Sequence, residues 1–297
     1  MRCLVTGGAG FIGSNLVKYL AKQGFGITVL DNLSTGNKRN LVGLPIRLTV
    51  GSILNRKLLD RSIAGVDTVF HLAASVGHQR SVDFPLQDAE TNVQGTINVL
   101  EAAKKAGVSR IVYSSSAAVY GVTTPVPVTE DHCCEPISPY GCTKLCADKL
   151  CLAYARLYGM GVVCLRYFNA YGVGQQYDAY GNVIPIFLAR LQAKQPLVIY
   201  GDGEQTRDFV NTRDIVRANL LAAQSKAVGA YNIGSGVATS INTLARFFKG
   251  EVTHEPERPE VKHCVANISA AQTAFNYFPM TDLFAGLAEY ACRESLK

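Results

Sequence analysis

A glycine-rich turn between a short apolar run and a helical pattern constrains the fold of this chain more than any other stretch. The apolar run Cys3 to Thr6 leads into Gly7, Gly10 and Gly13, and a helical pattern then continues to about residue 24. Without side chains at these positions the backbone can lie against a pyrophosphate, whose charge meets the positive N-terminus of the helix. We therefore expect a dinucleotide-binding β-α-β unit at this end of the chain.

The same alternation of short apolar runs with helical patterns continues to about residue 166. The further runs are Ile27 to Asp31, Ile46 to Val50, Val66 to His71, Arg110 to Ser114 and Val162 to Arg166. Between two of them, the segment Asp88 to Gly107 carries apolar residues on one helix face and ends in glycine. This rhythm predicts an α/β fold with a Rossmann-type, doubly wound parallel sheet.

After residue 166 the rhythm loosens, and glycine, proline and tyrosine become denser. We expect a smaller mixed α/β substrate-binding lobe there. The segment Asp208 to Ser225 and a strand at Tyr231 to Ile233 are expected to return to the main sheet. The expected domains are therefore 1–166 plus about 208–233 for the cofactor, and about 167–207 plus 234–297 for the substrate.

Composition narrows the setting. Of 297 residues 48% are hydrophobic and 18% are charged, and no apolar run approaches the roughly 20 residues of a membrane helix. The first residues lead straight into the glycine turn, so we expect no cleaved signal peptide and a cytoplasmic location. The net charge of +6 is scattered without a basic block, which argues against nucleic acid as a partner.

The nine cysteines indicate reduced thiols. Their number is odd, Cys133 and Cys134 are adjacent, and no C-x-x-C spacing occurs. We expect most of them to be small buried hydrophobic residues, and we expect no metal site.

An acid follows the second expected strand. Asp31 stands about 20 residues after the glycine turn, where a carboxylate accepts hydrogen bonds from the adenosine ribose of a dinucleotide. Its charge would repel a 2′-phosphate, so we expect NAD as the cofactor. Lys38 and Arg39 lie close by in sequence and keep NADP open as an alternative.

A second constellation lies at the start of the helix expected from Ser138 to Gly159. Tyr140 and Lys144 are four residues apart and therefore share one helix face. A phenol with an ordinary pKa of roughly 10 is a poor base at neutral pH. An ammonium at about 4 Å, with an oxidised nicotinamide beside it, would lower the pKa enough for Tyr140 to act as a base. The alternative is a surface pair on an amphipathic helix.

Five stretches, in order along the chain, resemble the extended short-chain dehydrogenase/reductase family and, within it, the NAD-dependent UDP-hexose 4-epimerases. They are TGGAGFIG, HLAA at His71 to Ala74, SSSAAVYG at Ser114 to Gly121, the pair Tyr140 and Lys144, and LRYFNAYG at Leu165 to Gly172. The resemblance covers residues 1 to about 270. It implies that Tyr140 is the catalytic acid and base, that Lys144 lowers its pKa and holds the nicotinamide ribose, and that Ser116 hydrogen-bonds the sugar hydroxyl.

The resemblance also implies two sets of binding residues. The cofactor set is Gly7, Gly10, Phe11, Ile12, Gly13, Asp31, Asn32, Ser52, Ile53, Leu72, Ala73, Ala74, Asn92, Ser114, Tyr140, Lys144 and Tyr167. The substrate set is Ser116, Tyr140, Asn169, Asn182, Val183, Tyr200, Arg207, Arg258 and Cys264. In the second set Arg207 and Arg258 would grip a diphosphate, because each guanidinium can bond two oxygens. Cys264 would line the sugar pocket beside the 2-substituent and leave room for an N-acetyl group.

The residues after Ser116 separate two kinds of reaction. Relatives that dehydrate a nucleotide sugar carry an acid and a base at the positions of Ala117 and Ala118, because removal of water needs both. With two methyl groups there, the keto intermediate can only take its hydride back. We therefore expect redox-neutral inversion at C4 of a UDP-hexose, with UDP-glucose and UDP-galactose as the substrates and the N-acetylated pair as further candidates.

Two other functions remain open at this point. One is a net NAD(P)-dependent oxidoreductase, or another epimerase, that acts on a nucleotide sugar. The other is a regulator or scaffold that binds NAD(P), although such proteins commonly lose the Tyr140 and Lys144 pair. The helices expected at Asp88 to Gly107 and Ser138 to Gly159 resemble those that pair two subunits, so we expect a homodimer. A role in galactose metabolism follows from the same resemblance.

Overall fold

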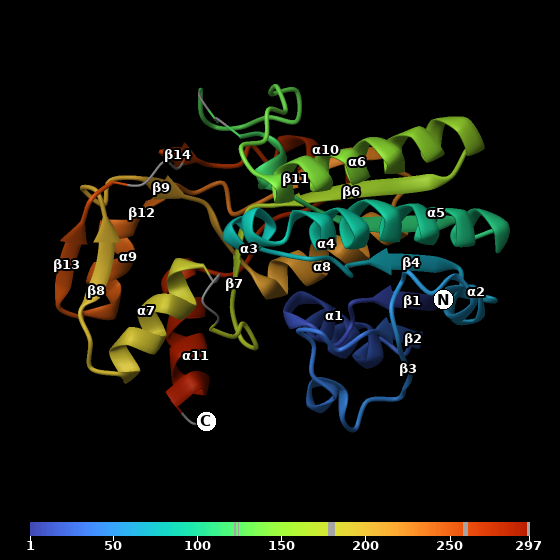
Figure 1. The fold of residues 1–297 in the computed structure, drawn as a ribbon, viewed down its shortest axis with the longest axis horizontal. Coiled ribbons are helices and arrows are strands. Elements are labelled where there is room, and N and C mark those ends of the chain that lie inside the picture. Colours follow the sequence, from blue (N-terminus) through green and yellow to red (C-terminus); the bar gives the residue numbers. More distant parts are fainter. Residues whose placement is uncertain (122, 124, 178–181, 258–260, 296–297) are drawn as a thin grey trace.

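The computed structural model describes residues 1–121, 123, 125–177, 182–257 and 261–295, and its centre is a seven-stranded parallel sheet (Figure 1). Its strands, in sheet order, are β11 (Gly229–Ile233), β6 (Gly161–Tyr167), β5 (Arg110–Ser116), β4 (Thr68–His71), β1 (Arg2–Thr6), β2 (Gly26–Asp31) and β3 (Ile46–Val50). Strand order reverses between β1 and β4, as it does in a doubly wound sheet. The predicted fold class is confirmed.

Helices cover both faces of this sheet. The helices on one face are α1 (Phe11–Lys22), α8 (Thr212–Gln224) and α10 (Ser269–Phe275), and those on the other are α2 (Arg56–Ile63), α5 (Gly95–Lys105) and α6 (Pro139–Tyr158). Side chains alternate along a strand, so Cys3 and Val5 belong to the first core and Leu4 to the second. Both faces are buried, which explains why the strands read as continuous apolar runs.

The helix predicted at Asp88 to Gly107 is part of a longer helical stretch. It begins with α3 (His78–Asp83) and α4 (Pro85–Ala89), passes through a π-helical turn, η2 (Glu90–Gln94), and continues as α5. A π turn adds a residue to the helical repeat, and such turns often occur at functional sites. Here the turn carries the buried Asn92, so the sequence predicted the helix but not this irregularity.

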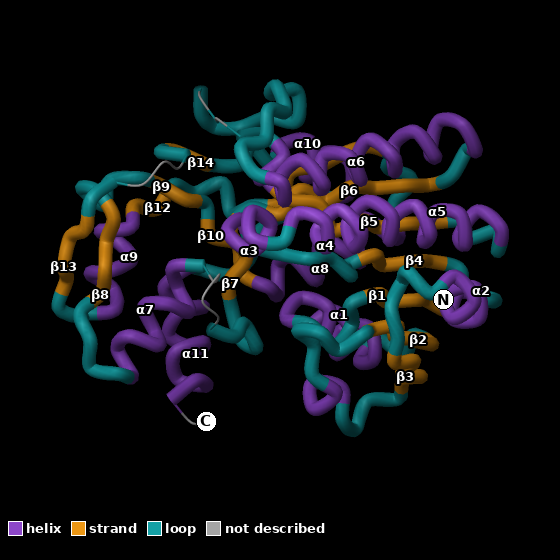
Figure 2. Tube along the Cα trace, viewed as in Figure 1, coloured by secondary structure: helices purple, strands orange, loops and turns teal. Residues whose placement is uncertain are grey.

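The remaining elements form smaller sheets at the left of Figures 1 and 2, with three helices around a core of their own. The helices are α7 (Val183–Gln192), α9 (Ile241–Phe248) and α11 (Leu283–Ser295). The strands are β7 (Asn169–Tyr171) with β10 (Phe209–Asn211), β8 (Leu197–Tyr200) with β13 (Val252–Glu255), and β9 (Thr206–Arg207) between β12 (Thr239–Ser240) and β14 (His263–Cys264). Between β10 and β12 the chain returns to the main sheet, where β11 pairs in parallel with β6 as the sequence predicts.

All nine cysteines are free thiols, as expected from their spacing. The expectation that most of them are buried is wrong. Only Cys3, Cys151, Cys164 and Cys264 are buried, whereas Cys142 and Cys146 lie on the outer surface of α6. Among the described helices, none is long and apolar enough to cross a membrane.

Candidate active site

The structure places Tyr140 and Lys144 in the first turns of α6, beside the carboxyl end of β5. Ser138 is the N-cap, and its Oγ accepts a 3.1 Å hydrogen bond from the backbone N–H of Gly141. The backbone N–H of Tyr140 donates to Oγ of Ser81 in α3 at 3.0 Å. Two hydroxyls therefore fix the start of the helix that carries both predicted catalytic residues.

Gly141 lets this helix approach the loop after β5. That loop is a short 3-10 helix, η3 (Ala117–Val119), and a Cβ added at Gly141 would lie 2.5 Å from the carbonyl oxygen of Ala118. Any other residue would push α6 away from Ser116. The glycine between Tyr140 and Lys144 therefore has a steric role that the sequence pattern did not reveal.

Lys144 is 3% exposed and faces the end of β5. Its Nζ donates a 2.7 Å hydrogen bond to the carbonyl oxygen of Ser114 and lies 4.9 Å from the centre of the Tyr113 ring. Burial lowers the pKa of Lys144 to about 8, and the carboxylates of Asp148 and Asp88 oppose that shift. The ammonium is thus held by one backbone oxygen and balanced by two nearby acids.

Tyr140 is a protonated phenol in the protein alone. Burial raises its pKa to about 12, a hydrogen bond with Ser116 opposes the rise, and Asp88 adds to it. Nζ of Lys144 lies 6.0 Å from the centre of the Tyr140 ring and donates to the carbonyl oxygen of Ser114. Because the phenol oxygen lies at the rim of the ring, the ammonium distance of about 4 Å to that oxygen stays a prediction. With a pKa this high Tyr140 is a poor base at neutral pH, so its predicted role requires positive charge beside the phenol oxygen.

The glycine turn and α1 fit a dinucleotide. A Cβ at Gly13 would lie 2.1 Å from the carbonyl oxygen of Gly7, so only glycine allows this tight turn. Gly10 is the N-cap of α1 and provides no side-chain cap, which leaves the first N–H groups of α1, from Phe11 and Ile12 onward, for an anionic ligand.

Asp31 lies at the end of β2, buried, beside this turn. Its Oδ2 accepts from the backbone N–H of Ala9 and its Oδ1 from that of Leu33, both at 2.8 Å. Since a carboxylate offers about four acceptor positions, lone pairs remain for ribose hydroxyls. Asp31 therefore also braces the glycine turn, a role that its position in the sequence did not indicate.

The other predicted cofactor residues end neighbouring strands. Ser52 and Ile53 follow β3, and the Ser52 hydroxyl accepts from the backbone N–H of Leu54 at 3.1 Å. The exposed Asn32 follows β2, and Leu72, Ala73 and Ala74 follow β4. Tyr167 ends β6, and its buried hydroxyl is within 3.1 Å of Oδ1 of Asn219 in α8.

The predicted substrate residues fall into two groups. Arg207 and Cys264 are register partners on β9 and β14, and Cys264 packs in one apolar cluster with Ala117 and Phe168. Burial raises the pKa of the Cys264 thiol to about 11. Asn169 begins β7, and its backbone N–H donates to the carbonyl oxygen of Asp208 at 2.9 Å.

The second group lies in the smaller sheets and their helices. Asn182 is the exposed N-cap of α7, Val183 is its first residue, and Tyr200 ends β8. The structure therefore brings Cys264 toward the loop of Ala117, whereas Asn182 and Val183 lie at the start of α7. Arg258 lies outside the described residues.

Comparison with known proteins identifies the family. The family described as NAD dependent epimerase/dehydratase matches residues 3–234, most of the chain. The chain belongs to the NAD dependent epimerase/dehydratase family. A putative UDP-glucose 4-epimerase of Methanocaldococcus jannaschii is 40% identical over 294 residues, covering 96% of this chain and 95% of that protein.

Solved structures agree with this assignment to the epimerase/dehydratase family. A UDP-glucose 4-epimerase of Thermotoga maritima, determined with UDP-glucose, has a TM-score of 0.95 at 35% identity and covers 100% of both chains. A UDP-N-acetylglucosamine 4-epimerase of Methanobrevibacter ruminantium, in complex with UDP-N-acetylmuramic acid, has a TM-score of 0.95 at 33% identity and covers 100% of this chain and 99% of that one. The cofactor of this family is NAD.

Sequence reasoning missed a buried polar chain in this family member. His71 in β4 has an Nδ1–Oγ1 distance of 2.8 Å to Thr6 and an Nε2–Oγ1 distance of 3.0 Å to Thr96. Thr96 donates its one hydroxyl hydrogen to the carbonyl oxygen of Asn92 at 2.6 Å, so it accepts from His71 Nε2–H. Thr6 in turn accepts from the backbone N–H of Ala73 at 3.2 Å. Burial lowers the pKa of His71 to about 3, so the ring is neutral.

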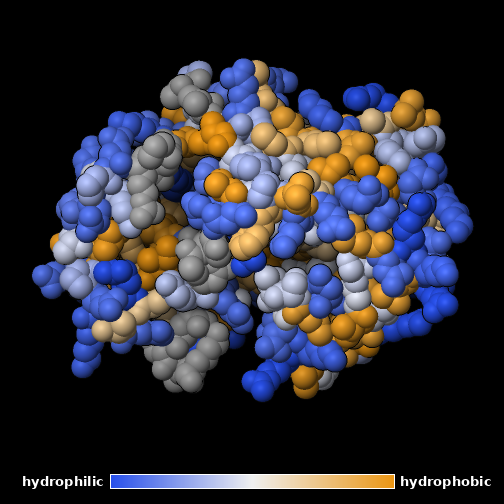
Figure 3. All heavy atoms as spheres, viewed as in Figure 1, coloured by the Kyte–Doolittle hydropathy of each residue, from blue (hydrophilic) through white to orange (hydrophobic). Residues whose placement is uncertain are grey.

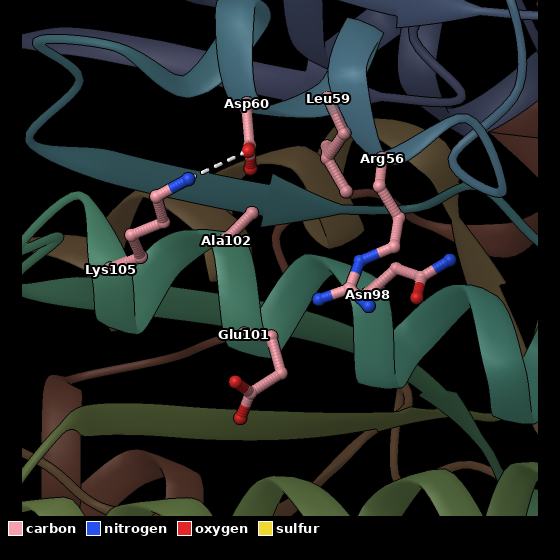
Figure 4. Close-up of a pocket in the computed structure, with 7 residues that line it drawn as sticks. All are labelled: Arg56, Leu59, Asp60, Asn98, Glu101, Ala102 and Lys105. Carbon is pink, nitrogen blue, oxygen red and sulfur yellow. Dashed lines mark hydrogen bonds and ion pairs between the residues drawn. The ribbon is translucent and has the colours of Figure 1, made fainter.

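A surface pocket lies elsewhere in this family member, between α2 and α5 (Figure 4). It is lined by Arg56, Leu59, Asp60, Asn98, Glu101, Ala102 and Lys105. Lys105 forms a 2.9 Å ion pair with Asp60 across it. None of the predicted catalytic residues lines this pocket, so it is not the candidate active site.

Proposed function

We propose that this protein is a UDP-hexose 4-epimerase, with UDP-glucose and UDP-galactose as its substrates. The observation that carries this proposal is the convergence of Ser116, Tyr140 and Lys144 beside two alanines. A hydrogen bond with Ser116 lowers the pKa of Tyr140, and Nζ of Lys144 donates to Ser114 at the end of the same strand. The similarity to epimerases that are named for UDP-glucose and UDP-N-acetylglucosamine supports the same conclusion.

Tyr140 accepts and returns the proton of the 4-hydroxyl. As the C4–H bond breaks, its phenolate oxygen takes the hydroxyl proton, and it gives the proton back when the C–H bond forms again on the opposite face. Ser116 hydrogen-bonds the same sugar oxygen and keeps it close to Tyr140. When bound, oxidised NAD supplies the hydride acceptor for C4 and the further positive charge that the site needs. Lys144 contributes its own charge and its N–H donors.

The two alanines explain why the reaction would stop at inversion. Ala117 and Ala118 form η3 directly after Ser116, and Oγ of Ser116 accepts from the backbone N–H of Ala118 at 3.1 Å. A dehydratase needs an acid and a base at these positions for the leaving hydroxyl and the neighbouring proton. Methyl groups provide neither, so the keto sugar can only be reduced again.

We propose that Arg207 binds the diphosphate and that Cys264 lies beside the sugar. Arg207 and Cys264 are partners across two short strands, and Cys264 packs near Ala117, so one small sheet can hold both ends of a UDP-sugar. Asn169, Asn182, Val183 and Tyr200 are proposed to complete the site. Because a thiol is small, we further propose that N-acetylated hexoses are accepted.

The test is product identification without added redox partner. The purified protein should convert UDP-glucose to UDP-galactose with no reductant, and absorbance of reduced nicotinamide should not grow. A steady growth of that absorbance, matched to a stable keto product, would instead indicate a net oxidoreductase.

We propose a homodimer that pairs through α5 and α6. Apolar side chains are exposed around these helices, including Leu86 at 84% and Leu157 at 72%, and Figure 3 shows orange patches over this region. Burial of such patches against a second subunit would favour dimer formation.

We also propose that the protein is a cytoplasmic enzyme of galactose metabolism. We also propose two domains, 1–166 plus about 208–233 and about 167–207 plus 234–297. The separate core among α7, α9 and α11 supports this division, whereas α10, which lies within 234–297, packs on the main sheet.

A further inference from the structure

Asp88 is a buried acid that the proposed reaction does not use. It lies in α4, is 0% exposed, and forms no ion pair among the described residues. Its Oδ2 accepts hydrogen bonds from Thr143 Oγ1 at 2.5 Å and from Asn92 Nδ2 at 3.1 Å. Its Oδ1 has no hydrogen-bond partner among the described residues. A carboxylate in this position needs an explanation, since an uncompensated buried charge is costly.

The carboxylate lies at the end of the polar chain through His71. In that chain the hydrogens run in one direction, from His71 to Thr96 and from Thr96 to the Asn92 backbone. The Asn92 side chain then donates to Asp88, and it also bonds the backbone of Ser75 in both directions, at 2.9 and 3.0 Å. Strands β1 and β4, which carry Thr6 and His71, are thus connected to α4 through oriented hydrogen bonds.

Thr143 extends this connection to the catalytic helix. It stands immediately before Lys144, is 9% exposed, and lies 55 residues away from Asp88 in sequence. Its hydroxyl lies 2.5 Å from Asp88 Oδ2 and 3.1 Å from the carbonyl oxygen of Tyr140. We assign the single hydroxyl hydrogen to the shorter bond, which is then charge-assisted. Asp88 therefore holds the turn of α6 between Tyr140 and Lys144.

The charge of Asp88 acts on the same two residues. It raises the pKa of Tyr140 and of Lys144, in the second case together with Asp148. Asp148 is already paired with Arg166 at 2.9 Å, whereas the free oxygen of Asp88 has no such partner. The titratable and charged groups that face Lys144 are Tyr140, Asp148 and Cys151 on α6, Tyr113 on β5, the neutral His71 on β4 and Asp88 on α4.

We propose that Asp88 is a positioning residue for the reaction: through Thr143 it anchors the helix that carries Tyr140 and Lys144, and through its charge it balances the Lys144 ammonium. This inference rests on the proposed function for its catalytic consequence. The anchoring itself does not depend on which sugar is turned over.

Two substitutions separate the anchor from the charge. Asp88→Asn keeps the shape and one acceptor oxygen but removes the charge. Both limbs of the kcat–pH profile should move to lower pH by roughly half a unit or more. On the alkaline limb this shift lowers kcat about threefold at a given pH.

Thr143→Val keeps the side-chain volume but removes the hydroxyl. It should lower kcat about tenfold at every pH without moving the profile. Thr143→Ser should restore activity, and Asp83→Asn on the exposed part of α3 is the matched acid control.

Hydrogen exchange and thermal melting provide readouts without turnover. Thr143→Val should speed exchange of the amides at the start of α6, and Asp88→Asn should melt within a few degrees of the parent protein. An unmoved pH profile in Asp88→Asn would overturn the role of the charge. Parental exchange and kcat in Thr143→Val would overturn the anchor, and losses that only follow a lower melting temperature would reduce Asp88 to a structural residue. If the parent protein does not epimerise UDP-glucose, the proposed function fails while the exchange result still tests the anchor.

Discussion

The ammonium of Lys144 lies 6.0 Å from the centre of the Tyr140 ring and donates a 2.7 Å hydrogen bond to the carbonyl oxygen of Ser114. Burial raises the pKa of Tyr140 to about 12, and the hydrogen bond with Ser116 offsets only part of that rise. Activation of the tyrosine would then depend on the cofactor charge. This arrangement would keep the base inactive until the site is loaded.

Tyr140→Phe should lower kcat by about 10²-fold or more, since it removes the proposed acid and base. NAD affinity should change little, because the ring remains in place. Steady-state kinetics and an NAD-binding titration check the two parts. Tyr158→Phe, near the end of the same helix and 50% exposed, is the matched control. Near-parental epimerisation by Tyr140→Phe would remove the residue from its role.

Cys264→Tyr should selectively lower activity on UDP-N-acetylglucosamine while retaining activity on UDP-glucose. The added ring would overpack a pocket next to Ala117, and overpacking typically costs about 1 to 3 kcal/mol, or roughly 5-fold to 150-fold in rate. Parallel assays on both substrates measure the selectivity, with Cys264→Ser as the small-residue control. Equal loss on both sugars, or a parent enzyme inactive on the N-acetylated sugar, would show that Cys264 is not the gate.

Gly13→Ala should weaken NAD binding by about tenfold or more. The added methyl would lie 2.1 Å from the carbonyl oxygen of Gly7, so the turn must open and its N–H groups must leave their positions. A binding titration measures the affinity. Gly26→Ala, where the new Cβ would lie 3.4 Å from a side-chain carbon of Arg2, controls for the substitution itself. An unchanged affinity in Gly13→Ala would place the pyrophosphate elsewhere.

The neutral His71 should make the protein less stable in acid. Its pKa is lowered from 6.5 to about 3, so the unfolded state binds the proton more readily than the folded state does. The stabilisation is fully present above pH 6.5 and is lost as the pH falls toward 3, by a few kcal/mol at most. Denaturant unfolding over this range should show a steeper loss for the parent than for His71→Asn. The exposed His78→Asn should keep the parental slope, and identical slopes in all three would contradict the assignment.

Local patterns predicted the strands, the glycine turn and the pair of Tyr140 and Lys144, because each depends on residues close in sequence. They did not predict the direction of Lys144, since the carbonyl oxygen of Ser114 that holds it is 30 residues away. The Asp88 and Thr143 contact is also long-range, and it depends on how α4 meets α6. The close approach of α6 to η3 at Gly141 also depends on tertiary packing, because the carbonyl oxygen it contacts belongs to Ala118.

The position of β11 has a consequence for synthesis on the ribosome. Strand β6 ends at Tyr167, but β11, which pairs with its outer edge, ends only at Ile233. More than sixty further residues must therefore leave the ribosome before β11 can cover the edge of β6. During that interval the backbone of a buried, apolar strand is open to pairing with other nascent chains. A fragment that stops before Gly229 should therefore aggregate, even though it would contain the glycine turn, Tyr140 and Lys144.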